Sequence, residues 1–297
     1  MELRHIRYFL AVVEEGNVTK AAEKLMIAQP PLSRQIHDLE EELGTALFLR
    51  QPRGVTLTEA GNRFLNYARQ IDELARRSCA DLRDLKSGLK GTIYLATVEG
   101  RAPKLLSGWI ARFHKEYPGV EYDLWNGNTD DVINRLHNGL CDMAVITAPY
   151  DQEHFEGVEV GREPWVAILP KHHPLAEPGD EIELARLADQ ELIIPSRQSR
   201  KQEIEDWFAP LGVKPVIIAR LAHMLNAYEL SAHGLGIAIF PAAANEYTTK
   251  DVVIKKIVHP ERSASYLLIR RKEGLRTNVA GEFWDFVSRQ YRETAIS

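Results

Sequence analysis

Apolar residues at the start of the chain recur every three or four positions, as they do along one face of a helix. Leu3, Ile6, Leu10 and Val13 follow this spacing, and Gly16 comes soon after the last of them. The pattern therefore predicts a first helix that ends near Gly16.

Two more helices are predicted directly after this one. The second covers residues 18–25, and Asn17 before it is a favourable N-cap. The third begins at Gln29-Pro30-Pro31, because proline is tolerated in a first helical turn, where its missing N–H costs nothing. Gly44 ends this helix. Two short helices joined by a three-residue turn are typical of a helix-turn-helix.

A turn between two short strand-like segments follows the third helix. Residues 47–50 and 54–57 are mostly apolar, and Gln51-Pro52-Arg53-Gly54 between them has the composition of a turn. The sequence therefore predicts a small two-stranded wing, and residues 1–57 form a winged helix-turn-helix domain.

From Thr58 to about Lys86 the pattern predicts one long helix. Its apolar residues alternate between spacings of four and three, which is a heptad seam. The seam expected to contact a second chain consists of Phe64, Ala68, Ile71, Ala75, Leu82 and Leu85. A long helix with one such stripe favours a dimer stalk, and the alternative is a helix buried in a core. Gly88 and Gly91 end the helix, so residues 58–90 form a linker helix and hinge.

Residues 91–297 alternate between strand-like and helix-like segments, which predicts two small α/β lobes with parallel sheets. Strands are expected at 92–97, 120–125, 142–147, 164–170, 191–195, 215–219, 236–240 and 265–271. Helices are expected at 105–117, 130–138, 199–208, 224–233 and 277–292. The chain crosses between the lobes near 161–164 and returns near 265. The first lobe then covers about 91–162 and 268–297, and the second about 163–267.

Composition and charge narrow the class of protein. The chain of 297 residues is 44% hydrophobic and 27% charged, which is usual for a globular protein. It has no apolar run of the roughly 20 residues that a membrane span needs, and no signal peptide is recognisable, so a cytoplasmic location is expected. The net charge is −5, and residues 1–58 contain more acidic than basic side chains. DNA binding then requires the basic groups to gather on one face.

Short motifs in the N-terminal region resemble those of the LysR-type transcriptional regulators. They are NVTKAAEKL at 17–25, QPPLSRQI at 29–36, LEEELG at 39–44, LF at 47–48 and LTEAG at 57–61. The segments LCDMAV at 140–145, HPLA at 173–176 and GLGIA at 234–238 are more loosely similar to landmarks of the family's effector domain. Ala28 is a departure, because many relatives have a hydroxyl there that caps the recognition helix.

This resemblance implies a fold, partners and a function. The fold is a winged helix-turn-helix with a long linker helix, followed by a two-lobed effector domain like the periplasmic binding proteins. The partners are double-stranded operator DNA with an interrupted palindrome, a small-molecule effector and a second copy of the chain in a homodimer that assembles to a homotetramer. The resemblance leaves open whether RNA polymerase is a further partner. The function is regulation of transcription, commonly activation, with no cofactor, metal or catalysis implied.

The alternative is a solute-binding or enzymatic α/β protein with an accessory helical domain. The lack of a recognisable signal peptide counts against a solute-binding protein. Against an enzyme, the sequence contains no nucleophile elbow, P-loop, zinc-protease motif or dinucleotide-binding motif. His172-His173 has no third ligand at useful spacing, so a metal site is not expected there.

The exposed face of the third helix holds the expected contacts with DNA. Glutamine can pair with adenine and arginine with guanine in the major groove, and wing arginines can reach phosphates or a narrow minor groove. The residues are Gln29, Pro30, Pro31, Ser33, Arg34 and His37 of the helix, with Arg50 and Arg53 of the wing. The alternatives are a solvated polar face and ordinary turn arginines.

Effector contacts are expected where strands end and helices begin, because helix N-termini favour anions. The residues are Thr97, Glu99, Gly100, Arg101, Asn128, Thr129 and Thr147 of the first lobe, with Ser196, Arg197 and His223 of the second. Arg101 and Arg197 have the only fixed positive charges in this set, so a small carboxylate, preferably hydroxylated, is the expected ligand. The alternative for each residue is a cap of its own helix.

Overall fold

The computed structural model describes residues 1–51, 54–84, 89–242, 251–273 and 277–294. The chain forms two compact units, Met1–Gly88 and Leu89–Ser297. Among the described residues, none of the helices combines the length and the apolarity required to cross a membrane.

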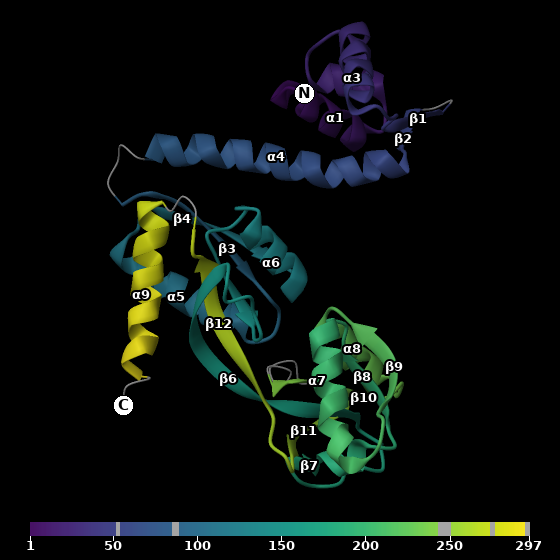
Figure 1. The fold of residues 1–297 in the computed structure, drawn as a ribbon, viewed down its shortest axis with the longest axis vertical. Helices are drawn as coiled ribbons and strands as arrows, with labels where there is room; N and C mark the ends of the chain where they lie inside the picture. Colours follow the sequence, from purple (N-terminus) through teal and green to yellow (C-terminus); the bar gives the residue numbers. More distant parts are fainter. Residues whose placement is uncertain (52–53, 85–88, 243–250, 274–276, 295–297) are drawn as a thin grey trace. The chain divides into compact units, whose positions relative to one another are not determined.

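The N-terminal unit is a winged helix-turn-helix (Figure 1). Its elements are α1 (Leu3–Glu15), α2 (Val18–Lys24), α3 (Gln29–Leu43), the antiparallel hairpin of β1 (Phe48–Gln51) and β2 (Gly54–Leu57), and α4 (Glu59–Asp84). Phe9, Leu32 and Leu39 are fully buried in its core. Asn17 caps α2 as predicted, since its Oδ1 accepts from the backbone N–H of Thr19 at 2.8 Å.

The long helix α4 uses its apolar side chains differently from the predicted seam. Phe64 and Ala68 pack into the core of the N-terminal unit itself, and Ala68 has no surface left for a second chain. The exposed apolar side chains of α4 are Tyr67, Ile71, Leu74 and Leu82. Ala75 is half-buried, and Leu85 lies outside the described side chains. The exposed stripe therefore begins later than the seam and includes Tyr67 and Leu74, which the heptad pattern left out.

The C-terminal unit is a two-lobed α/β domain on a mixed sheet of order β4-β3-β5-β12-β6-β10-β8-β9, in which β11 also pairs with β6 and β7 pairs with β11. The first lobe contains β3 (Gly91–Thr97), α5 (Ala102–Glu116), β4 (Val120–Asn126), α6 (Thr129–His137), β5 (Met143–Thr147) and α9 (Asn278–Thr294). The second contains β7 (Glu181–Glu183), β8 (Glu191–Pro195), α7 (Gln198–Phe208), β9 (Val216–Leu221), α8 (Met224–Ala232), β10 (Ile237–Pro241) and β11 (Val252–Val258).

Two long strands join the lobes. β6 (Phe155–Pro170) and β12 (Ser263–Arg271) are paired antiparallel, and Figure 1 shows both running from one lobe into the other. Tyr266 of β12 belongs to the core of the first lobe, and Trp165 of β6 belongs to the core of the second. The register shifts between Tyr266 and Leu267, so the pairing is irregular where the strands pass between the lobes.

The prediction of parallel sheets is correct only in part. β3 is parallel to β4 and β5, and β8 is parallel to β9 and β10, but β6 and β12 are antiparallel to their neighbours. The sequence pattern missed β7, β11 and the first half of β6. Adjacent lysines make β11 resemble a surface segment, yet Lys255 is buried and its Nζ donates to the Glu177 carbonyl at 2.7 Å.

Candidate functional site

The third helix presents the expected DNA-reading residues on the surface of the N-terminal unit. Leu32, Ile36 and Leu39 fix its inner face in the core. The outer face exposes Gln29, Pro30, Pro31, Arg34 and His37, with Ser33 half-buried. Ala28 makes no side-chain cap at the start of the helix, as the departure from the family pattern predicted.

Arg34 is the best placed cation on this face. Its guanidinium is exposed and forms no hydrogen bond or ion pair with the residues that the structure describes, so its five donors are available to a base edge. His37 is partly engaged, because its Nε2 lies 3.4 Å from Glu41 Oε1. Arg50 is exposed on β1, and Arg53 lies outside the described residues.

Several acidic residues of the N-terminal unit bond to other groups of the same unit. This matters because residues 1–58 contain more acidic than basic side chains, which by itself disfavours DNA binding. Glu14 and Glu15 pair with Lys24 at 2.7 and 3.0 Å. Glu40 Oε1 accepts from the backbone N–H groups of Leu47 at 2.7 Å and Phe48 at 3.1 Å. These carboxylates are neutralised or used in structural bonds, so the excess of acidic side chains does not stand against binding by α3.

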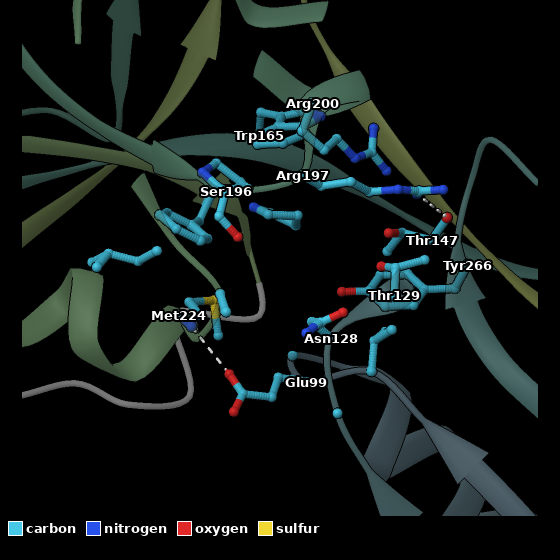
Figure 2. Close-up of a pocket in the computed structure, with 18 residues that line it drawn as sticks. Glu99, Asn128, Thr129, Thr147, Trp165, Ser196, Arg197, Arg200, Met224 and Tyr266 are labelled. Carbon is cyan, nitrogen blue, oxygen red and sulfur yellow. Dashed lines mark hydrogen bonds between the residues drawn. The ribbon is translucent and has the colours of Figure 1, made fainter. Parts of the chain in front are cut away.

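A cavity of about 110 Å³ lies between the two lobes of the C-terminal unit (Figure 2). The predicted effector residues that line it are Glu99, Gly100, Asn128, Thr129, Thr147, Ser196 and Arg197. The ends of β3, β5 and β8 and the first turns of α6 and α7 bring these residues together, as the strand-end argument predicted.

Thr97 and Arg101 do not line the cavity. Thr97 is only 2% exposed, and its hydroxyl donates to the carbonyl of Val98 at 2.9 Å. The guanidinium of Arg101 lies 3.4 Å from Oε1 of the buried Glu163 on β6. Both side chains therefore bond to other groups of the protein and do not face the cavity.

His223 is engaged in the same way, because a carboxylate of the opposite lobe caps α8. Oε1 of Glu99 lies 2.6 Å from Nδ1 of His223, and Oε2 accepts from the backbone N–H of Met224 at 3.0 Å. The N-terminus of α8, one of the helix starts expected to face a ligand, is thus occupied by the protein's own anion.

Sequence reasoning missed much of the lining, which is largely apolar. The missed residues are Gly127, Trp165, Pro195, Arg200, Leu221, Ala222, Phe240, Pro241 and Tyr266. Local patterns do not separate an apolar lining residue from a core residue. Trp165 and Tyr266 could have been found by position, because strands near the predicted crossing points at 161–164 and 265 must pass the cavity.

Arg197 connects the two lobes at one edge of the cavity. Its Nη1 donates to the carbonyl of Thr147 at 3.5 Å (Figure 2). Its Nη2 donates to the carbonyl of Pro149 at 3.1 Å. Its Nε lies 3.4 Å from Asp130 Oδ1. Burial lowers the pKa of this guanidinium and the Asp130 carboxylate raises it, and an arginine stays charged under both influences.

Arg200, one turn along α7, makes a parallel link. It is buried, pairs with Glu203 and donates to the carbonyl of Ala148 in the first lobe. Its guanidinium carbon lies 5.4 Å from the ring centre of Trp165, within the range of a cation–π contact. Together with Arg197, this side chain holds α7 of the second lobe to residues 147–149 of the first.

Three hydroxyl groups line the cavity without a partner of their own. The side chains of Thr129, Thr147 and Ser196 form no hydrogen bond with any residue that the structure describes. Asn128 differs, because its Oδ1 accepts from the backbone N–H of Asp131 at 3.0 Å and caps α6. Burial raises the pKa of the Tyr266 phenol, so this side chain meets the cavity uncharged.

Asp151, Glu153 and His154 form one group of metal-ligand atoms, all within 4.8 Å of one another. All three residues are exposed, and Asp151 Oδ1 accepts from the backbone N–H of Glu153 at 2.8 Å in a local turn. The Asp151 carboxylate raises the pKa of His154. This arrangement is an ion-paired surface turn. His173 is also used locally, since its Nδ1 accepts from the N–H of Leu175 at 3.1 Å.

Comparison with known proteins agrees with this architecture. Residues 3–62 match the family model of the bacterial regulatory helix-turn-helix protein, lysR family, and residues 86–292 match the LysR substrate binding domain. Two relatives come from Escherichia coli (strain K12). The uncharacterized HTH-type transcriptional regulator YnfL is 33% identical over 82% of this chain and 83% of its own. The Hca operon transcriptional activator HcaR is 31% identical over 92% of each chain.

Solved structures lead to the same family. The crystal structure of CbnR, a LysR family transcriptional regulator, has a TM-score of 0.78 and 28% identity and covers 98% of this chain and 99% of its own. Full-length CbnR complexed with its target DNA has a TM-score of 0.76, with 27% identity and 97% and 99% coverage. With both family models matched in order along one chain, this protein belongs to the LysR family of transcriptional regulators, with a helix-turn-helix DNA-binding domain and an effector-binding domain.

Proposed function

We propose that this regulator reads operator DNA with α3 and senses a small organic anion in the cavity between its two lobes. The observation that carries the proposal is the cavity itself, which receives unpartnered hydroxyl groups from both lobes at Thr129, Thr147 and Ser196. A ligand that bonds to these hydroxyls contacts both lobes at once.

The reading of DNA rests on the exposed face of α3. Arg34 and Gln29 offer the two side-chain types that pair bidentately with guanine and adenine. The N-terminal part of the helix, which carries these residues, is the part that enters the major groove in helix-turn-helix proteins. Arg50 on the wing adds a contact with the phosphate backbone.

Sensing follows from the two-lobed architecture. A ligand that touches both lobes binds most tightly when they are closed around it, so it increases the population of the closed arrangement. The links made by Arg197 and by Glu99 already join the lobes in the structure. A bound anion adds to these links, and we propose that the resulting change activates transcription.

Assembly through α4 would allow the protein to read a two-fold symmetric site. The exposed stripe of α4, formed by Tyr67, Ile71, Leu74 and Leu82, is apolar and self-complementary in spacing. We propose that it joins two chains into a dimer, and that two dimers form the homotetramer. A symmetric dimer places two α3 helices on two half-sites, which predicts an interrupted palindrome.

Selection from a random pool of DNA duplexes tests the proposed function. The full-length chain is expected to enrich duplexes that share two inverted half-sites, and the Arg34→Ala variant is expected to enrich no shared motif. If the wild-type chain retains duplexes that share no common sequence, it does not read operators.

A further inference from the structure

We propose that the ligand is a compact monocarboxylic acid whose apolar body is about the size of one ring, and that hydroxyl groups rather than arginines hold its carboxylate. This inference rests on the proposed function and names the class of molecule that the cavity takes. It departs from the sequence-based expectation of a hydroxylated acid clamped by arginine.

The volume of the cavity limits the size of the ligand. About 110 Å³ is available between the lobes. An engineered apolar cavity of roughly 150 Å³ is known to hold one benzene molecule. The cavity between the lobes is smaller than that one, so the apolar body of the ligand is at most one ring or a short chain, and a nucleotide or a disaccharide does not fit.

The second lobe forms an apolar wall for the body of the ligand. Trp165, Phe240 and Met224 line the cavity and are at most 6% exposed, and Leu221 lies beside them. In Figure 2, Trp165 and Met224 lie on the second-lobe side, away from Thr129 and Thr147. Apolar surface of this kind favours a ligand that removes a hydrocarbon body from water.

The first lobe and Ser196 supply the polar end. Thr129 opens α6, so its hydroxyl and the N-terminus of that nine-residue helix favour a negative charge at the same place. Thr147 ends β5 on the same side, and Ser196 reaches the cavity from the end of β8. Each of these hydroxyls can donate one hydrogen bond, so a carboxylate that lies between Ser196 and the two threonines can accept from both lobes.

The charges around the cavity already balance one another, which excludes the arginine clamp. Arg197 pairs with Asp130 and donates to two carbonyls, and Arg200 pairs with Glu203. The Glu99 carboxylate is bound at the N-terminus of α8. A second carboxylate or a phosphate would find no uncompensated cation among these groups, so the site selects against dianions.

Thermal shift and calorimetric titration of the full-length chain test this ligand class with four probes. Benzoate and hexanoate have one carboxylate and an apolar body, adipate adds a second carboxylate to a chain of the same length, and benzyl alcohol has the ring without the charge. Benzoate or hexanoate is expected to raise the melting temperature and to bind roughly tenfold or more tightly than adipate and benzyl alcohol.

Variants locate the binding site. Ser196→Ala and Thr129→Val each remove one hydroxyl and should weaken binding of the monocarboxylate roughly tenfold. The control is Ser199→Ala, the same change three positions along the chain at a residue outside the cavity lining, and it should bind like the wild type.

The outcomes separate this inference from the proposed function. Tighter binding of adipate, lost in Ser196→Ala, would overturn the monocarboxylate class and leave anion sensing in place. Equal binding of benzyl alcohol, or binding of benzoate unchanged in both cavity variants, would also overturn the inference. If no acid stabilises the chain, both the inference and the sensing of an anion fail.

Discussion

Glu99 of the first lobe is hydrogen-bonded to Met224 of the second, where its Oε2 accepts from the backbone N–H at 3.0 Å. The two residues are 125 positions apart in sequence, and the bond places a carboxylate at the N-terminus of α8. Figure 2 shows this link and the one from Arg197 to Thr147 at different edges of the cavity. The two lobes are therefore held together by groups of the chain itself on two sides of the cavity.

Replacing Glu99 by alanine should destabilise the C-terminal unit. The change removes a carboxylate cap from α8, which is worth about 1 kcal/mol and lowers the melting temperature of a domain this size by about 2–4 °C. Differential scanning calorimetry measures the shift. Glu121→Ala on β4, an exposed glutamate of the same unit, is the control and should melt like the wild type. Equal shifts in the two variants would mean that Glu99 does not cap α8.

Arg34 should determine which DNA sequence is read. Arg34→Ala is expected to lose about 1–3 kcal/mol of binding to the selected duplex in a fluorescence anisotropy titration. Arg34→Lys keeps the charge without the bidentate fork, so it should lose specificity and keep most of its affinity for random DNA. If both variants lose affinity for selected and random duplexes to the same extent, Arg34 contacts only phosphate.

The exposed stripe of α4 should hold two chains together. Leu82 is 66% exposed, and Leu82→Asp places a charge in the proposed contact, so sedimentation equilibrium should find a smaller assembly. Arg69→Asp is the control, because Arg69 is exposed on α4 and helical spacing points it away from Leu82. An unchanged assembly in Leu82→Asp would remove α4 from the dimer contact.

A serine at position 28 should stabilise the recognition helix. Ala28 is the N-cap of α3 with an extended backbone, and it makes no side-chain bond to the first turn. Ala28→Ser supplies the missing acceptor and should raise the free energy of unfolding of the N-terminal unit by about 0.5–1 kcal/mol in urea denaturation. Ala46→Ser, at an exposed position outside a helix, should leave that free energy unchanged. If Ala28→Ser does not raise the free energy of unfolding, α3 is capped in another way.

The winged helix-turn-helix could be predicted from sequence because its signals are local. Asn17 caps the helix that directly follows it, and the apolar stripe of α3 lies on the same helix as Arg34. The stalk seam was only partly predictable. Phe64 and Ala68 have the spacing of a dimer contact, but they pack into the core of their own unit, where Phe64 meets Phe9 of α1. Periodicity cannot say which partner an apolar face will meet.

The cavity was harder to predict because its chemistry depends on distant pairings. The ends of strands located Thr129, Thr147 and Ser196, since the topology of an α/β sheet brings such ends together. The engagement of Arg197 with Asp130 has no local signal, and neither does the bond from Glu99 to α8. These contacts turn an expected arginine clamp into links between the lobes.

A small acid in the cavity should alter how the chain holds its DNA. Footprinting on the selected duplex, with and without the acid that stabilises the chain most, tests this directly in the wild type and in Ser196→Ala. The acid is expected to change the protected region or the affinity of the wild type for the duplex, and to leave both unchanged in Ser196→Ala. An acid that binds in the cavity and leaves both the footprint and the affinity of the wild type unchanged would contradict it.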